Sequence, residues 1–353
     1  MMRPRLEWLL VFVPVSILSA LVLRNDLLTF LTSAAAILPL AGLIGGATDQ
    51  LALHAGPRVG GLLNATFGNV TELIVAIFLI LDDEIEIVKA SLTGSIAGNL
   101  LLVLGLSFFV GGLRNQEQHF SAEAASVHTS SLALAVAGLL MPALFVLTTG
   151  RHDEMQREVV SGVVAAVLIA LYACTLVFTL VTHQHLFRTA ESGERPTWSV
   201  RRAVAMLFVV TAVVAVESEL LVGSLEPALR TLGLSRLFVG LIVIPIIGNA
   251  AEHGAAVLFA MRNKLDVTLE VTTGSSLQIA LFVAPALVFV SLLAGHPMDF
   301  VFSPFEVATV GVAVLVVSLI ARDGRSNWLE GIQLLATYVI IAISFFFVRG
   351  VPA

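Results

Sequence analysis

The sequence predicts an all-α polytopic membrane protein with eleven transmembrane helices, and three observations support this. The chain has 353 residues, of which 58% are hydrophobic and only 12% are charged, whereas a soluble domain carries about 25% charged residues. Its mean hydropathy is +0.97, and several apolar runs reach the roughly 20 residues that a helix needs to cross a bilayer. The runs are also unbroken, whereas the strands of a membrane barrel would alternate in polarity.

Eleven apolar windows mark the expected spans. They cover residues 6–23, 27–46, 59–81, 86–111, 127–149, 157–182, 202–223, 236–261, 268–294, 304–321 and 328–348. The first window follows Arg3 and Arg5, as in a signal peptide. No small-residue cleavage site follows it, so we interpret this window as a retained leading helix.

Charged residues predict the orientation of the chain. Of the 19 lysines and arginines, 12 fall on the N-terminal side of the membrane and 7 on the other side. The positive-inside rule therefore places the N-terminus and the polar linker at 183–201 in the cytoplasm. The net charge of -6 is too scattered to form a basic face, which excludes nucleic acid as a partner. The sequence leaves the oligomeric state open, homo-oligomers included.

The chain contains an internal repeat. Gly68-Asn69 and Glu72 match Gly248-Asn249 and Glu252, 180 positions later, and Gly94-Ser95 matches Gly274-Ser275 at the same offset. Because asparagine and glutamate are rare in an apolar background, we interpret these matches as a duplication. We expect a leading helix at 1–24, one five-helix repeat at 25–182, the linker at 183–201 and a second five-helix repeat at 202–353.

The number of spans in each repeat determines their relative orientation. Since five is odd, the second repeat enters the membrane from the opposite side, and a pseudo-two-fold axis in the membrane plane relates the two repeats. Transporters with this architecture bind their substrate near the midplane, where the repeats meet. The sequence therefore predicts a transporter rather than an enzyme.

Two carboxylates are the leading site candidates. Glu72 and Glu252 lie near the centres of spans 59–81 and 236–261, where a charge costs about 3 kcal/mol on insertion scales. A lone glutamate there could be a protonated group that bonds a neighbouring helix. Duplication at equivalent depth makes a shared binding role the stronger interpretation.

Other polar residues recur beside these carboxylates. Asn69 and Asn249 stand three residues before the glutamates, so we expect each pair to share a helix face. We expect hydroxyl oxygens from Ser95 and Ser275 on the following spans, although a serine in a membrane helix often bonds its own backbone. The backbone candidates are Gly68, Gly248, Gly94, Gly274 and Pro245. The glycines permit close approach, and the proline, which removes a backbone donor, could unwind its helix and free carbonyl oxygens.

The expected ligands are all oxygen atoms, with Gln278 and Asn99 as second-rank polar candidates. Calcium takes 6 to 8 oxygen ligands in flexible geometry, so Ca²⁺ is the expected cargo and other divalent cations stay open. Two ionised glutamates balance one divalent ion, and two protonated glutamates are neutral. We therefore expect proton-coupled cation antiport, with Glu72 and Glu252 in the proton step, no separate cofactor, and the lipid bilayer as the protein's environment. His253 could relay protons or bond a neighbouring helix.

Three further acids stand near helix ends. We interpret Asp49, Glu219 and Glu226 as mouth or gating groups, against the alternative of plain interfacial solvation.

The motifs closely resemble those of the calcium/proton exchanger family. The resemblance rests on Gly61 to Leu73, Gly248 to His253 and Gly274 to Val283, and on flanking segments at 48–53 and 218–226. It implies eleven helices in two inverted repeats, with Glu72 and Glu252 as alternating carriers of protons and calcium. Asp49 stands where the family commonly has glutamate. The short N-terminal segment is similar to that of compact prokaryotic members in the plasma membrane.

Three rival functions would each require other sequence features or another use of the two carboxylates. A sodium/calcium exchanger of the same superfamily would carry G-T-S-L-P-E-like motifs, whereas this chain has G-N-x-x-E. A cation channel would use the two carboxylates as a selectivity ring. An intramembrane metal-dependent enzyme is disfavoured because the chain lacks an H-E-x-x-H pattern.

Overall fold

The protein is described here by a computed structural model that covers residues 6–149, 154–187 and 196–347. Parts of the predicted leading segment and linker, with Arg3, Arg5, Arg188 and Arg195, lie outside these ranges. Within them the chain is almost entirely helical, and ten helices are long and apolar enough to cross a membrane. The predicted all-α polytopic fold is confirmed.

Five long helices make up the first half. They are α2 (Asp26–Ala55); α3 (Pro57–Phe67) with α4 (Val70–Leu81); α5 (Ile85–Ala97), the π-helical turn η3 (Gly98–Val103) and α6 (Leu104–Arg114); α7 (Ala122–Thr149); and α8 (Glu154–Val177) with the π-helical turn η4 (Phe178–Thr182). A short 3-10 turn, η5 (Gln184–Leu186), follows.

The second half repeats this plan. It contains α9 (Val200–Gly223); α10 (Leu225–Leu232); α11 (Arg236–Phe238), the π-helical turn η6 (Val239–Val243) and α12 (Ile244–Met261); α13 (Leu265–Leu269), η7 (Glu270–Gly274), α14 (Ser275–Gln278), η8 (Ile279–Val283) and α15 (Ala284–Ala294); α16 (Pro304–Ile320) with η9 (Ala321–Asp323); and α17 (Trp328–Phe347). Strands β1 (Gln118–His119) and β2 (Arg325–Ser326) pair antiparallel between the halves.

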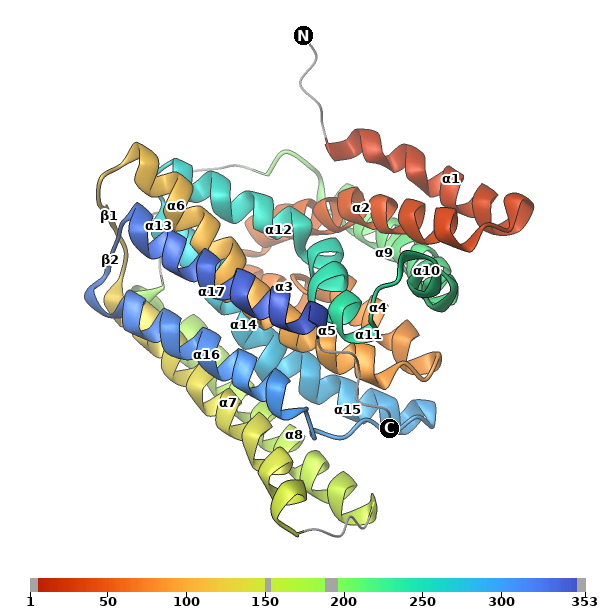
Figure 1. Cartoon of the computed structure of the whole chain (residues 1–353). Helices are drawn as coiled ribbons and strands as arrows, with labels where there is room; N and C mark the ends of the chain where they lie inside the picture. The colour runs from red at the N-terminus through yellow and green to blue at the C-terminus, as the bar shows by residue number, and fades with distance from the viewer. Residues whose placement is uncertain (1–5, 150–153, 188–195, 348–353) are drawn as a thin grey trace.

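The leading helix is shorter than the others. It runs from Glu7 to Leu23 through η1 (Leu6–Val11), α1 (Phe12–Leu18) and η2 (Ser19–Leu23), which gives about 25 Å at 1.5 Å per residue. It packs on α2 and α9 at one edge of the bundle, away from α7 and α8 (Figure 1). Five long helices in each half, after this leading helix, give the two halves opposite orientations in the membrane.

Two hydrophobic clusters hold the bundle together. The larger runs through α4, α5, α6, α12, α15 and their neighbours. The smaller belongs to α2 and α9 and is built from Leu40, Ile44, Ala47, Leu207, Val210 and Val214. The helix pair α2 and α9 packs through this smaller cluster and also contributes Phe30, Ile37, Leu221 and Val222 to the larger one.

A close crossing joins α5 of the first half to η6 of the second. A side chain at Gly94 would overlap the backbone carbonyl of Leu241. That carbonyl lies four residues before Pro245, which has no N–H to donate to it. The helix does not unwind there, since the π-helical turn η6 runs directly into α12, and Gly94 packs over the Leu241 carbonyl.

This crossing predicts that alanine substitutions at two glycines of one span differ sharply in their effect on stability. Gly94→Ala should destabilise the protein by about 1–3 kcal/mol, because its methyl group meets backbone rather than a movable side chain. Gly98→Ala should be tolerated, since nothing lies within 4 Å of the added carbon. Thermal unfolding in detergent, monitored as the loss of monodisperse protein, would compare the two variants. Equal melting temperatures would contradict the close crossing.

Candidate cation site between the repeats

The carboxylate of the first repeat lies at a break in a membrane span. α3 ends at Phe67 and α4 begins at Val70, so Gly68 and Asn69 form a turn inside the span. Glu72 therefore occupies the first turn of α4, where the positive end of the helix dipole favours an anion. Asn69 directly precedes α4, and its carbonyl accepts a helical hydrogen bond from Leu73 N at 3.0 Å.

The carboxylate of the second repeat lies in an unbroken helix. Asn249 and Glu252 stand one turn apart on α12, as the repeat pattern predicts. The two halves thus use one motif in two local conformations. Pro245 sits in the first turn of α12, and its carbonyl accepts a hydrogen bond from Asn249 Nδ2 at 3.1 Å.

The glycines of each motif face the glutamate of the other repeat. A Cβ at Gly68 would lie 3.5 Å from Glu252 Oε1, and a Cβ at Gly248 would lie 3.8 Å from Glu72 Cβ. Glu252 also lies within electrostatic reach of Glu72. The structure therefore brings both carboxylates to one place at the interface of the repeats.

The serines cross-link the repeats in a reciprocal way. Ser95 Oγ donates to Glu72 Oε1 and accepts from Asn249 Nδ2 at 3.4 Å. Ser275 Oγ donates to Asn69 Oδ1 at 3.0 Å. Neither hydroxyl donates to a backbone carbonyl of its own helix, so both belong to the polar network of the site.

The second-rank residues complete this network. Asn69 Nδ2 donates to Gln278 Oε1 at 3.0 Å, and the Gln278 amide donates to the carbonyl of Ala65. Asn99 Nδ2 donates to Ser275 Oγ at 3.2 Å, while its Oδ1 lies 3.0 Å from His253 Nε2. His253 thus bonds a neighbouring helix beside the glutamates.

One carboxylate oxygen of the site has no partner. Glu72 is only 3% exposed, and its Oε2 makes no hydrogen bond among the described residues. No lysine or arginine in the described ranges forms an ion pair with Glu72 or Glu252. A buried carboxylate in this setting requires a proton or a bound cation to balance its charge.

Residues on the two sides of the site differ in their exposure. Glu252 is partly exposed, and Gly68 and Asn64 on the α3 side are exposed. On the α4 side, Val75 and Leu79 are buried.

The three predicted mouth residues lie on three different helices. Asp49, on the last turns of α2, is exposed and lies within electrostatic reach of Glu252. Glu219 is exposed on α9. Glu226 lies on α10, where Arg230 at 2.8 Å and Arg236 at 3.6 Å hold its pKa below the usual range.

Sequence reasoning missed the buried acid of α9. Glu217 is fully buried and accepts a hydrogen bond from Ser16 Oγ of α1 at 2.8 Å. The buried positions of this helix recur every three or four residues, at 203, 207, 210, 214, 217 and 221. This periodicity would have singled out Glu217 rather than the exposed Glu219.

The sequence matches a known transporter family over both halves. The family described as sodium/calcium exchanger protein matches residues 25–181 and 202–347. The Ca²⁺/H⁺ antiporter of Synechocystis is 49% identical over 96% of this chain and 96% of its own length. The Ca²⁺/H⁺ antiporter of Aphanothece halophytica is 46% identical over 98% of this chain and 96% of its own.

A solved structure, that of native YfkE, has a similar fold. It superposes with a TM-score of 0.85 and 39% identity, covering 98% of this chain and all of its own. From these similarities in sequence and fold, the chain belongs to the sodium/calcium exchanger protein family and, within it, to the Ca²⁺/H⁺ antiporters.

Proposed function

We propose that this protein exchanges Ca²⁺, and other divalent cations, for H⁺ by alternating access, as a secondary active transporter rather than an enzyme. Glu72 and Glu252 bind either the cation or protons. The observation that supports this most directly is the unpartnered, buried oxygen of Glu72 beside a second carboxylate. The names of the related antiporters support the choice of ions.

The ligand set suits a hard cation. Two carboxylates, the amide oxygens of Asn69 and Asn249, and the hydroxyls of Ser95 and Ser275 supply oxygen atoms only. Calcium accepts 6 to 8 such ligands and tolerates irregular geometry, whereas magnesium demands a tight octahedron. We infer no cofactor beyond the transported ions.

Charge balance explains the coupling. With one Ca²⁺ bound, two ionised glutamates leave the site neutral, and with both glutamates protonated it is neutral again. The bare, doubly charged site is costly to enclose in a low-dielectric interior. The protein therefore changes its access only when loaded, which couples calcium to protons.

The organisation of the chain supports alternating access. We propose the division into a leading helix at 1–24, a first repeat at 25–182, a cytoplasmic linker at 183–201 and a second repeat at 202–353. Inverted repeats around a central site provide two related packings, each open to one side. We place the protein in a prokaryotic plasma membrane, with its N-terminus in the cytoplasm.

The central experiment measures uptake of radioactive Ca²⁺ into proteoliposomes driven by an imposed pH gradient. Glu72→Gln and Glu252→Gln should each reduce uptake by about a hundredfold or more, because one neutralised carboxylate leaves a divalent ion unbalanced. Glu158→Gln, which neutralises an exposed glutamate of α8, is the matched control and should transport normally. Full activity in either site variant would refute the proposed site.

The same vesicles separate the rival functions. A sodium gradient in place of the pH gradient should drive no uptake by a Ca²⁺/H⁺ antiporter, whereas it would drive a sodium/calcium exchanger. A channel would conduct calcium without any proton gradient.

Competition between the ions predicts a pH dependence. Protons that bind Glu72 and Glu252 remove calcium ligands, so the apparent KM for Ca²⁺ should rise as the pH on the calcium side falls. Initial rates over a series of calcium concentrations and pH values would check this. A KM that stays constant across the series would show that protons and calcium do not share the site.

A further inference from the structure

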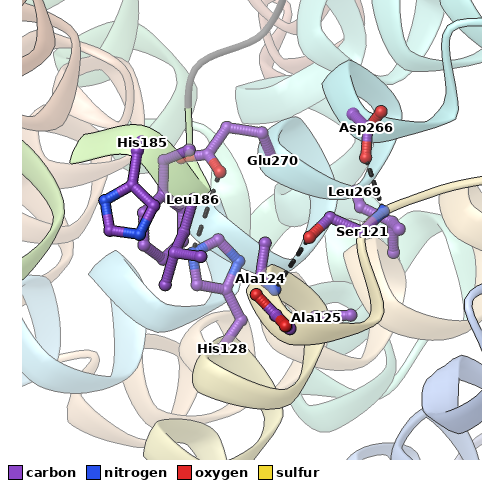
Figure 2. A pocket seen from close by; sticks show the side chains of 11 residues that line it. Ser121, Ala124, Ala125, His128, His185, Leu186, Asp266, Leu269 and Glu270 are labelled. Atoms are coloured by element: carbon purple, nitrogen blue, oxygen red, sulfur yellow. Dashed lines mark hydrogen bonds and ion pairs between the residues drawn. The ribbon is translucent and has the colours of Figure 1, made fainter. Parts of the chain in front are cut away.

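The structure contains a polar cavity outside the transport site. It has a volume of about 310 Å³ and lies between the start of α7, η5 and the segment α13–η7 (Figure 2). Its carboxylates, on Glu123, Asp266 and Glu270, are exposed. Asp266 also accepts a hydrogen bond from the backbone N–H of Ser121 at 2.7 Å. Because water solvates the charge of an exposed carboxylate, this cavity requires no bound ion.

Another polar cluster is closed to solvent. It lies where α1, α2 and α9 meet, and its members Ser16, Ser33 and Glu217 are each 0% exposed. Glu217 stands six residues before Gly223, the last residue of α9, so it lies about 9 Å inside this span. The cluster joins the leading helix to one long helix of each repeat.

The contacts of Glu217 leave one of its carboxylate oxygens unpaired. Oε1 lies 2.8 Å from Ser16 Oγ, and Ser16 Oγ lies 2.7 Å from the carbonyl of Val13. Ser33 lies beside the carboxylate. Neither Glu217 Oε2 nor Ser33 Oγ, however, makes a hydrogen bond among the described residues. Two neighbouring buried polar atoms, from different helices, therefore lack partners.

The charge of Glu217 has no cationic side chain to balance it. None of the ion pairs between described residues includes Glu217. A proton on Oε1 would be accepted by Ser16, which would then donate to Val13, but Oε2 and the Ser33 hydroxyl would stay unpaired. Unpaired polar groups in a buried place are costly. A cation coordinated by both oxygens satisfies them and balances the carboxylate at the same time.

The ligand set selects the kind of cation. Its atoms are oxygens only, from one carboxylate and the hydroxyls of Ser16 and Ser33, and such ligands suit a hard cation. One ionised carboxylate balances a single positive charge, whereas a divalent ion would leave a net charge inside the bilayer. The transport site differs in having two carboxylates. The chemistry at Glu217 therefore fits a small monovalent cation.

We propose that Glu217, Ser16 and Ser33 bind one Na⁺ ion, which fastens the leading helix to α2 and α9. Ser16 and Glu217 are 201 residues apart in the sequence, so the ion joins distant parts of the chain. Because its ligands are closed to solvent, this is a structural ion of the fold and takes no part in the exchange. The proposal is independent of the transport function.

The test measures the thermal unfolding of the purified protein in detergent, without calcium and without an ion gradient. The wild-type melting temperature should rise by several degrees, and then level off, as NaCl replaces choline chloride at constant ionic strength. The reason is that an ion that binds only the folded protein stabilises it. Glu217→Gln should abolish the rise. Equal wild-type melting temperatures in the two salts, or an undiminished rise in Glu217→Gln, would overturn the proposal.

Ser33→Ala tests the site without removing a charge. Because Ser33 Oγ bonds no described residue, its loss should leave the melting temperature in choline chloride unchanged. The Na⁺ concentration that gives half of the maximal rise should increase severalfold, since one ligand is lost. The same sodium dependence as in the wild type would count against the site. This variant also keeps the proposal testable should Glu217→Gln fail to fold.

Two controls separate this site from other sources of a sodium effect. Glu219→Gln neutralises an exposed acid of the same helix and should keep the full sodium response. The double variant Glu72→Gln/Glu252→Gln, which removes the transport carboxylates, should keep it as well. Loss of the response in either control would assign the effect elsewhere and refute the proposal. Absence of calcium uptake by the wild type would refute the transport function instead.

Discussion

An ionised carboxylate is unstable in the middle of a bilayer unless another charge accompanies it, because hydrocarbon and packed protein solvate charge poorly. This protein places two glutamates there, and no described lysine or arginine pairs with either. The balancing charge must therefore arrive and leave with the cargo. The other residues of the site position the two carboxylates for this exchange.

Duplication gives the two carboxylates reciprocal surroundings. Gly68 makes room beside Glu252, and Gly248 makes room beside Glu72. Ser95 joins Glu72 to Asn249 across the interface, while Ser275 reaches Asn69. The site consequently exists only where the repeats meet, and a shift of one repeat against the other changes all of these contacts together.

The site residues and the exposed acids lie on different helices. Glu72, Glu252 and the two serines stand on α4, α12, α5 and α14, which join the larger hydrophobic cluster. The helices α2 and α9 pack on one another through the smaller cluster, contribute to the larger one as well, and carry Asp49 and Glu219. The buried Glu217 bonds the leading helix to this pair. The transport site thus lies on helices of the larger cluster, whereas the exposed acids lie on helices that take part in both clusters.

The sequence alone determined the fold class, the span positions and the pairing of Glu72 with Glu252. These depend on apolar length and on a repeated motif, both of which are local or strictly periodic along the chain. Tertiary packing decided the break at Gly68 and Asn69, the unbroken helix after Pro245 and the burial of Glu217 instead of Glu219. It also decided that Glu226 pairs with Arg230 and Arg236. Such outcomes depend on which distant helices meet, and a helix's own sequence does not encode the shape or charge of the neighbour that it will contact.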